Sequence, residues 1–441
     1  MSFAGIQSSV SLSASQASAL GLIRQRIKEG EPCVIFVTGK AGTGKSTVIH
    51  AIKRAFRVVT VAPTGLAALN VGGETLHRFF AIPIGLTDPF KAKPLREGRR
   101  KLLMAIDALV IDEISMARAD VIDAVSAVMS ATLQDPRPFG GKPVIVVGDM
   151  WQLEPVAPRS GEESSWFYDL YESTFWFDAR VFKGTPSSLG LDTVQIEICE
   201  LTEMFRQSDE NFKDALNLIR IGDPEGLRHI NSRAGATWKG TQPICLTLTN
   251  AKADSINEQC LSRLTDEAEV FTAVVSGDFR ESEYPLPLEL TLKQGSRVMV
   301  ARNLMIDGAL VSNGSLGKIL SIDGDEVRVA LDDGRECAIK PVEWEKTTFG
   351  VTDSGELTNT ATGKFKQIPL RLAYAVTGHK AQGQTLDSAY LALERPTFAH
   401  GQLYVSLSRV RTIEGLFLDR KLTARDIVVN PRVVEFAGGF L

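Results

Sequence analysis

The chain has 441 residues, too many for one ordinary hydrophobic core, and this length predicts two to four domains. Its apolar fraction of 44% and charged fraction of 23% are typical of a soluble globular protein, and no apolar run is long enough to cross a bilayer. A formal net charge of -4 argues against binding nucleic acid through bulk positive charge, although a narrow basic channel remains compatible with it.

The cysteines and the N-terminus indicate a reducing compartment. The five cysteines form no CxxC pair and their number is odd, which disfavours a disulfide framework or a zinc site. The Ser-rich N-terminus has no basic residue before Arg24, so it lacks the features of a signal or transit peptide. We therefore expect the protein to act where it is made.

The first half of the chain alternates short β-rich runs with helical stretches. The runs lie at 34–37, 58–61, 108–111 and 144–147. This alternation predicts a parallel sheet flanked by helices. The stretch 81–100 contains several Pro, Gly and basic residues, and we expect an irregular excursion there.

A glycine-rich phosphate-binding motif, GKAGTGKS, follows the first run and opens a helical stretch. It matches G-x-x-x-x-G-K-[ST], in which glycines let backbone N–H groups turn toward phosphates at a helix N-terminus. Lys45 is expected to reach the β- and γ-phosphates, and the Ser46 hydroxyl to ligate Mg²⁺. The residues predicted to bind the nucleotide here are Gly39, Ala41, Gly42, Thr43, Gly44, Lys45, Ser46 and Thr47.

Two further polar groups follow buried runs of the predicted sheet. The run 108–111 ends in Asp112 and Glu113, which we assign to Mg²⁺ and to the attacking water, respectively. Gln152 follows the run 144–147, and its amide can both donate and accept hydrogen bonds, as a γ-phosphate sensor requires. The alternatives are a pair of surface acids and a solvent-exposed loop.

The second half predicts another α/β domain that contains a β-rich insertion. Strand-like runs lie at 244–248, 372–376 and 389–393, and Phe212, Leu216 and Ile219 are spaced as on a helix. A second helix is expected at 251–264. Two Asp-Gly pairs, at 323–324 and 333–334, lie between alternating apolar and polar residues and predict consecutive hairpins. A small antiparallel β-domain is therefore expected at 265–365.

Several motifs together resemble those of superfamily 1 helicases, and most of all the Pif (petite integration frequency) family, with RecD-like and Dda-like helicases as relatives. They are GKAGTGKS, VAPTGLAALN, GETLHRFF, DEIS, GDMWQLEPV, LTEMFRQ, VTGHKAQGQTLD and GQLYVSLSRVR. The resemblance runs from about residue 12 to 416 and includes every motif in order. It implies an α/β fold of two RecA-like P-loop domains, with ATP between them, a small inserted antiparallel β-barrel domain and a short wedge-like insertion.

The resemblance also divides the chain into domains. The first RecA-like domain is expected at 1–200, with 81–100 as the wedge-like insertion. The second RecA-like domain combines 201–264 with 366–441, and the inserted β-barrel occupies 265–365. For the excursion the alternative is a disordered surface loop, and for the β-domain it is an interaction module for a protein partner.

Further site residues come from the same resemblance. It implies that Gln16 reads adenine, that Arg206 and Arg409 reach the γ-phosphate, and that Gln382 and Gly383 complete this side of the site. A guanidinium placed on developing phosphate charge is worth on the order of 10³–10⁵ in turnover. The residues that the resemblance assigns to single-strand contact are Pro63, Thr64, Gly65, Thr75, His77, Phe79, Thr377, His379 and Lys380.

The function implied is an ATP- and Mg²⁺-dependent DNA helicase that moves 5′–3′ on single-stranded DNA. Its expected partners are single-stranded DNA, tailed duplexes and G-quadruplexes, with no membrane, and the isolated chain is expected to be a monomer. The expected location is cytoplasmic, at the bacterial nucleoid, or nuclear in a eukaryote. The alternatives are a helicase subunit of a recombination nuclease complex, a P-loop kinase or other phosphotransferase, and an ATP-driven switch that grips nucleic acid without unwinding it.

Overall fold

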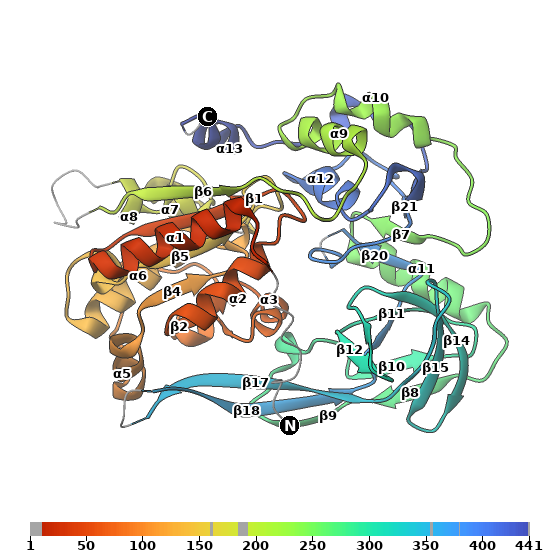
Figure 1. Cartoon of the computed structure of the whole chain (residues 1–441), viewed down its shortest axis with the longest axis horizontal. Helices are drawn as coiled ribbons and strands as arrows, with labels where there is room; N and C mark the ends of the chain where they lie inside the picture. Colours follow the sequence, from red (N-terminus) through yellow and green to blue (C-terminus); the bar gives the residue numbers. More distant parts are fainter. Residues whose placement is uncertain (1–10, 159–161, 184–192, 353–355, 379, 440–441) are drawn as a thin grey trace. The chain divides into compact units, whose positions relative to one another are not determined.

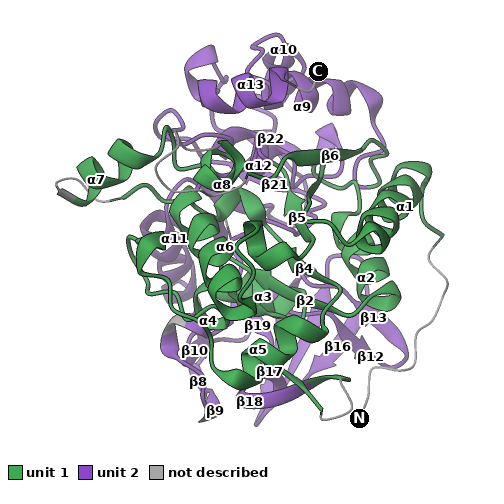
Figure 2. Ribbon diagram, turned by 90° about the vertical axis from the view of Figure 1, so that its left-hand side faces the viewer, with its two compact units in different colours: residues 1–149, 156–205, 349–358 green, residues 150–155, 206–348, 359–441 purple. Residues whose placement is uncertain are grey.

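The computed structural model describes residues 11–158, 162–183, 193–352, 356–378 and 380–439. These form two compact units, coloured separately in Figure 2. Unit 1 comprises Met1–Asp149, Val156–Phe205 and Phe349–Thr358, and unit 2 comprises Met150–Pro155, Arg206–Thr348 and Asn359–Leu441. Among the described residues, no helix combines the length and apolar character needed to cross a membrane.

Unit 1 contains a six-stranded sheet in the order β3-β2-β4-β5-β1-β6, and every neighbouring pair of strands is parallel. Its strands are β1 (Val34–Gly39), β2 (Val58–Ala62), β3 (Glu74–Thr75), β4 (Ala108–Ile111), β5 (Val144–Gly148) and β6 (Ile196–Leu201). Its helices are α1 (Ala14–Glu29), α2 (Lys45–Ala55), α3 (Gly65–Asn70), α4 (Leu76–Phe79), α5 (Glu97–Ala105), α6 (Ala119–Leu133), α7 (Glu162–Leu170) and α8 (Arg180–Lys183). The predicted parallel α/β arrangement is confirmed.

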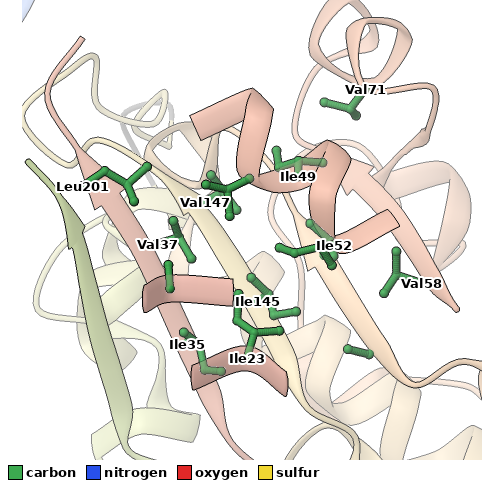
Figure 3. Packing of buried hydrophobic residues seen from close by; sticks show 14 of the residues in the cluster. Ile23, Ile35, Val37, Ile49, Ile52, Val58, Val71, Ile145, Val147 and Leu201 are labelled. Carbon is green, nitrogen blue, oxygen red and sulfur yellow. The ribbon is translucent and has the colours of Figure 1, made fainter. Parts of the chain in front are cut away.

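Alternation along β1 divides the core of unit 1 between the two faces of the sheet. Ile35 and Val37 pack with apolar residues of α1 and α2 in one cluster (Figure 3). Phe36 points to the opposite face, where its ring meets that of Trp176 edge-on with centroids 5.0 Å apart. The sheet is therefore buried on both faces, as a parallel sheet requires.

Helix α1 has signals at both ends that fix its length. Ser13 and Gln16 form a capping box, and Gly30 ends the helix in the left-handed region at φ 73°. Ala19 and Ile23 face the core one helical turn apart. The N-terminal turn of α1 lies beside the phosphate loop, where the Gln16 side chain is buried.

The predicted excursion is an ordered segment fastened to α6. It contains a short 3₁₀ helix, Pro89–Lys91, and leads into α5. The Thr87 N–H donates to the buried carboxylate of Asp120 at 2.9 Å, and the Leu95 N–H donates to the Thr132 hydroxyl at 2.9 Å. The Gly85 carbonyl accepts from Arg118 at 2.6 Å. Three anchors along eleven residues leave this segment little freedom on the face of unit 1.

Unit 2 contains a parallel sheet in the order β20-β7-β21-β22 and several antiparallel sheets (Figure 1). The parallel strands are β7 (Ile244–Thr247), β20 (Ala375–Thr377), β21 (Ala389–Leu391) and β22 (Leu416–Leu418). The helices are α9 (Glu210–Arg220), α10 (Gly226–Ile230), α11 (Asn250–Ser262), α12 (Gln402–Leu407) and α13 (Pro431–Gly438). The expected helices around Leu216 and at 251–264 correspond to α9 and α11.

The β-rich part of unit 2 centres on an antiparallel sheet in the order β16-β15-β14-β11-β19. Both predicted hairpins are present, with Gly324 and Gly334 at φ 58° and 88° in the turns. The strands here are β8 (Glu269–Thr272), β9 (Val274–Gly277), β10 (Glu289–Leu292), β11 (Arg297–Val300), β12 (Leu304–Ile306), β13 (Ala309–Val311), β14 (Leu316–Asp323), β15 (Glu326–Leu331), β16 (Glu336–Ile339) and β19 (Leu370–Leu372). Strands β17 (Val342–Val351) and β18 (Leu357–Gln367) belong to unit 2 except for the residues within Phe349–Thr358, which are part of unit 1.

The run 372–376, expected to be one strand of the second α/β domain, is divided between two sheets, so that prediction is wrong. β19 pairs antiparallel with β11, whereas β20, which starts at Ala375, pairs parallel with β7. Ala373 still donates to the Arg297 carbonyl, and the Tyr374 carbonyl already accepts from Cys245. The apolar pattern is continuous because both sheets bury the residues that they contain. Nothing in the pattern shows where the chain stops pairing with β11 and starts pairing with β7.

All five cysteines are free thiols. Cys33, Cys245 and Cys337 are buried, and Cys199 and Cys260 are half-buried. Burial raises the pKa of Cys33 to about 11 and that of Cys245 to about 12. Burial also raises the pKa of the Cys199 and Cys337 thiols.

Candidate functional site

The phosphate loop joins β1 to α2 and is shaped by close backbone approach. Gly42 and Gly44 have φ of 85° and 79°, which favours glycine. A Cβ on Gly39 would lie 2.9 Å from the Leu201 carbonyl oxygen, so only glycine fits there. The Lys45 ammonium donates to the carbonyls of Gly39 at 2.8 Å and Lys40 at 3.2 Å. The Lys45 side chain therefore lies across the loop in which it is predicted to bind phosphates.

The other residues predicted in this loop occupy its floor and the first turn of α2. Ala41 and Thr43 are buried, and the Thr43 hydroxyl donates to the Lys40 carbonyl at 3.0 Å. Ser46 is exposed, and the Thr47 N–H donates to the Gly44 carbonyl at 2.9 Å. The predicted nucleotide-binding residues of this loop lie between the end of β1 and the first turn of α2.

Gln16 lies directly against this loop. Its amide Nε2 donates to the Thr43 carbonyl at 3.0 Å, and its Oε1 accepts from the Ser13 N–H at 3.0 Å. The N–H and hydroxyl of Ser15 donate to the carboxylate of Glu203, which lies just beyond β6, and lower its pKa to about 2. The sequence reasoning missed Glu203, although its motif, LTEMFRQ, was identified. Glu203 fastens the segment that carries Gln16.

Asp112 and Glu113 lie at the carboxyl end of β4, the edge of a parallel sheet where ligands bind. The pKa of Asp112 is raised to about 7, mainly by burial and to a smaller extent by the neighbouring charge of Glu113. The positive charge of Lys45 acts in the opposite direction. Glu113 is held in the left-handed region at φ 49°, which is uncommon for a side chain of this kind. Crowded negative charge of this kind suits a divalent cation, the ligand that Asp112 and the Ser46 hydroxyl are expected to bind.

Gln152 belongs to the short segment Met150–Pro155 of unit 2. Its Oε1 accepts from the Gln382 amide at 2.9 Å, so two residues 230 positions apart meet within this unit. The segment is also held by His400, whose Nε2 lies 2.9 Å from the Met150 carbonyl oxygen. His400 directly precedes the motif GQLYVSLSRVR, which begins at Gly401.

Arg206 and Arg409 converge on Ser408 within unit 2. Arg206 donates to the Ser408 carbonyl at 3.2 Å and to the Thr385 hydroxyl at 3.0 Å. Arg409 donates to the Ser408 hydroxyl at 2.9 Å and to the Val405 carbonyl at 2.9 Å. Burial lowers the pKa of Arg206, but a guanidinium remains charged at neutral pH.

Other residues complete this cluster of unit 2. The Gly383 carbonyl accepts from Arg206 at 3.4 Å, and Gly383 has φ of 81°. Gln207, which the sequence reasoning missed, donates to the Ser408 carbonyl at 3.0 Å and the Val410 carbonyl at 3.2 Å. Its position next to Arg206 in the motif was the signal that could have identified it.

Two predicted single-strand contacts in unit 1 start helices. Thr64 caps α3 by accepting from the Ala67 N–H at 3.3 Å, and Thr75 caps α4 by accepting from the Arg78 N–H at 3.3 Å. Pro63 and Gly65 flank Thr64 and are half-buried. The Nδ1 atom of His77 lies 3.3 Å from the Ile82 carbonyl oxygen. Each of these residues retains some exposed surface.

Phe79 does not fit its expected role in contacting a single strand. Its side chain is 1% exposed, its ring meets Phe80 edge-on at 4.8 Å, and the Arg99 guanidinium covers it at 4.3 Å. A ring that is enclosed in this way has no free face for a nucleobase. Phe79 completes the apolar floor beneath α4 instead.

The contacts predicted in unit 2 follow β20. The Thr377 hydroxyl accepts from the Lys380 N–H at 3.2 Å and lies 3.4 Å from the Asn250 side-chain oxygen. Lys380 is exposed. His379 lies outside the described residues.

Comparison with known proteins gives a consistent result. Residues 11–226 match the sequence profile of a family described as PIF1-like helicase. The ATP-dependent DNA helicase Pif1 of Bdellovibrio bacteriovorus is 31% identical over 441 residues, which cover 97% of this chain and 92% of that protein. The chain belongs to the PIF1-like helicase family.

Other members differ in length from this chain. The ATP-dependent DNA helicase PIF1 of mouse is 34% identical over 400 residues, and the human protein is 33% identical over 423. The two alignments cover 57% of the mouse protein and 60% of the human protein, so the chain spans about three fifths of the length of these relatives.

Solved structures of PIF1-like helicases have the same fold. The crystal structure of Bacteroides sp Pif1 in complex with ADP-AlF4 has a TM-score of 0.86 at 33% identity, covering 98% of this chain and 97% of that one. Bacteroides Pif1 bound to ssDNA has a TM-score of 0.67 at 32% identity with the same coverage. The mixed α/β fold with parallel sheets is therefore that of the family.

Proposed function

We propose that this chain is an ATP-dependent DNA helicase that moves along single-stranded DNA and separates duplexes. The observation that carries the proposal is its similarity to the Bdellovibrio protein named ATP-dependent DNA helicase Pif1, along nearly the whole of both chains. Two solved structures add support: one of Bacteroides sp Pif1 in complex with ADP-AlF4, and one of Bacteroides Pif1 bound to ssDNA. In this proposal the substrates are ATP and DNA, single-stranded or as tailed duplexes.

The proposal extends to the architecture. The parallel sheets of the two units are taken as RecA-like, and the antiparallel sheet around β11 and β14 as the core of a small β-barrel domain. The domains are proposed at 1–200, at 201–264 with 366–441, and at 265–365. The segment 81–100 is proposed as a wedge, supported by its anchoring to α6 and by Ile84, which is 83% exposed.

In the proposed reaction, Lys45 neutralises charge on the β- and γ-phosphates and Glu113 removes a proton from the attacking water. Ser46 and Asp112 hold Mg²⁺, which supplies charge neutralisation on the phosphates when bound. Arg206 and Arg409 stabilise the charge that develops on the γ-phosphate. Lys45, Arg206 and Arg409 are buried or half-buried and have defined hydrogen-bond partners, so these cations are organised in advance.

A sensing role is proposed for the pair Gln152 and Gln382. An amide that already bonds another amide can exchange partners when a phosphate oxygen is added or lost. Gln16 is proposed to recognise the adenine base, supported by its contact with the phosphate loop. Gly383 is proposed to complete the site, since a Cβ there would meet nothing within 4 Å.

The strand is proposed to contact both units through small polar groups and backbone rather than through base edges, which suits binding without sequence preference. The proposed contacts are Pro63, Thr64, Gly65, Thr75, His77, Thr377, His379 and Lys380. Movement is proposed to be 5′–3′, and G-quadruplexes are proposed among the substrates. The protein is proposed to act as a monomer located with the chromosome of its cell.

Hydrolysis of ATP with and without a single-stranded oligonucleotide tests the proposal. We expect strong stimulation by the oligonucleotide, and a loss of roughly 10²–10³ in turnover for Lys45→Ala, as when one donor to transition-state charge is removed. Lys28→Ala, an exposed lysine of α1, is the matched control and should behave as wild type.

Hydrolysis indifferent to nucleic acid would contradict the helicase proposal and favour a phosphotransferase. If stimulation is found, duplexes with a 5′ or a 3′ tail decide the direction. Unwinding only of the 3′-tailed duplex would overturn the proposed polarity, and stimulation without unwinding of either would indicate a binding switch.

A further inference from the structure

A cavity of about 1050 Å³ lies in unit 1 beneath the segment 81–96. Residues of α4, α5 and α6 complete its walls, and Figure 2 shows these helices in unit 1. Apart from the buried Phe79, none of the residues assigned above to nucleotide or single-strand contact lines it, although its outer wall belongs to the segment proposed as a wedge. The cavity therefore needs an explanation of its own.

Its inner walls are apolar. They are formed chiefly by Phe80, Ile82, Leu86, Leu95 and Val128. Phe80 and Ile82 are buried, whereas Phe90 is 54% exposed at the opening. A space of this size and character matches pockets that bury apolar groups of a ligand.

The rim is positively charged in a chain whose net charge is -4. Lys91, Lys93 and Arg96 lie at the opening and are exposed. Lys91 pairs with Asp88 at 3.1 Å. Within the part of the chain that the structure describes, Lys93 and Arg96 pair with no carboxylate, so both are available to an anionic ligand.

The cavity is a built feature of the fold. The Gly85 carbonyl, the Thr87 N–H and the Leu95 N–H are each bonded to residues of α6 or the residue before it, as described above. These bonds hold the outer wall at a fixed height above Ala124 and Val128. A preformed pocket loses little conformational entropy when a ligand binds.

We propose that this cavity is a docking site for an acidic peptide segment of a protein partner. An apolar side chain of the peptide enters the cavity, and its carboxylates pair with Lys93 and Arg96. Nucleic acid fits less well, because nucleobases carry polar edges that the apolar walls would leave without partners. The proposal does not depend on helicase activity and is tested without ATP.

The probe is a fluorescein-labelled peptide of about ten residues, all Asp or Glu except for a C-terminal Leu-Phe. Fluorescence anisotropy with the full chain should show saturable binding that weakens as salt is added. Lys93→Glu with Arg96→Glu should weaken binding roughly tenfold or more. The matched control, Arg24→Glu with Lys28→Glu, reverses two exposed charges of α1 and should leave binding unchanged.

Two further comparisons test the apolar half of the site. A peptide ending in Ser-Ser, and the Phe90→Ser variant with the original peptide, should each bind more weakly. Melting temperatures equal to wild type would show that the variants are folded. Equal binding by the cavity and control variants would overturn the proposal, as would displacement of the peptide by a thymidine oligonucleotide whose own binding is lost in the Lys93 and Arg96 variant.

Discussion

Asp426 shows how one buried carboxylate is stabilised in unit 2. It is fully buried and accepts from Arg420 through both oxygens, at 2.9 and 2.5 Å, and from the Thr423 N–H at 2.7 Å. Burial acts to raise the pKa of Asp426, but the bonds from Arg420 and Thr423 outweigh it and hold the pKa below its ordinary value. Its charge is therefore favoured by folding.

The lowered pKa makes stability sensitive to acid. A carboxylate with a depressed pKa stabilises the fold above its unfolded pKa of about 3.9, and the stabilisation is lost as pH falls through the folded pKa. Asp426→Asn should cost roughly 1–3 kcal/mol at pH 7, because Arg420 loses a charged partner. Urea unfolding should show a shallower loss of stability below about pH 4 in the variant than in wild type. Parallel curves for the two proteins would contradict this assignment.

At the scale of elements, β3, α4 and α5 are joined through Glu74. This side chain is 2% exposed, accepts from Arg99 of α5 at 2.8 Å, and lies 3.5 Å from the Arg78 guanidinium of α4. It also accepts from the Phe349 N–H at 3.1 Å. The next residue, Thr75, caps α4, so the position of a proposed strand contact depends on this network.

Glu74→Gln keeps the shape of the side chain and removes its charge. We expect a loss of roughly 1–3 kcal/mol in the free energy of unfolding and weaker binding of a thymidine oligonucleotide, since Thr75 and His77 are no longer held in place. ATP binding should change less. Glu97→Gln, at an exposed carboxylate of α5, is the control. A loss of stability with unchanged oligonucleotide affinity would show that Glu74 has only a structural role.

Elements marked by local chemistry were predictable from sequence. The phosphate loop, the strands of unit 1 and the hairpins at Gly324 and Gly334 each have glycines or alternation that allow few other structures. The division of 372–376 between β19 and β20 was not predictable, because two buried strands leave the same apolar pattern. Phe79 was misassigned for a related reason, since a sequence does not show whether an aromatic ring faces a strand of DNA or the core.

Contacts between site residues that lie far apart in the sequence were equally unpredictable. The bond between Gln152 and Gln382, and the convergence of Arg206 and Arg409 on Ser408, join segments that lie about 200 residues apart or more. Family resemblance suggested the residues, but not their partners. Spacing along the chain constrains neighbours in one helix or strand and says little about contacts between elements.

For the whole molecule, the number of phosphates that its cations neutralise sets the response of DNA binding to salt. In the proposed function, a chain of charge -4 holds single-stranded DNA mainly through hydroxyls and backbone, and should therefore release few counterions. If about three phosphates are neutralised by cations, the logarithm of affinity should fall by roughly 2 per decade of salt, using about 0.7 per contact. Anisotropy of a labelled oligonucleotide between low and moderate KCl measures this slope. Nanomolar binding to blunt duplex that persists in high salt would contradict this picture.

The buried thiols have a practical consequence for fluorescence labelling. Cys33, Cys199, Cys245 and Cys337 are held as neutral thiols by the burial that raises their pKa, and a neutral thiol is a poor nucleophile toward maleimides. A cysteine introduced on an exposed turn, such as that at Gly324, would therefore react well ahead of these four. Single-molecule studies of movement can thus begin from the natural sequence, with Cys260 as the one native thiol to replace.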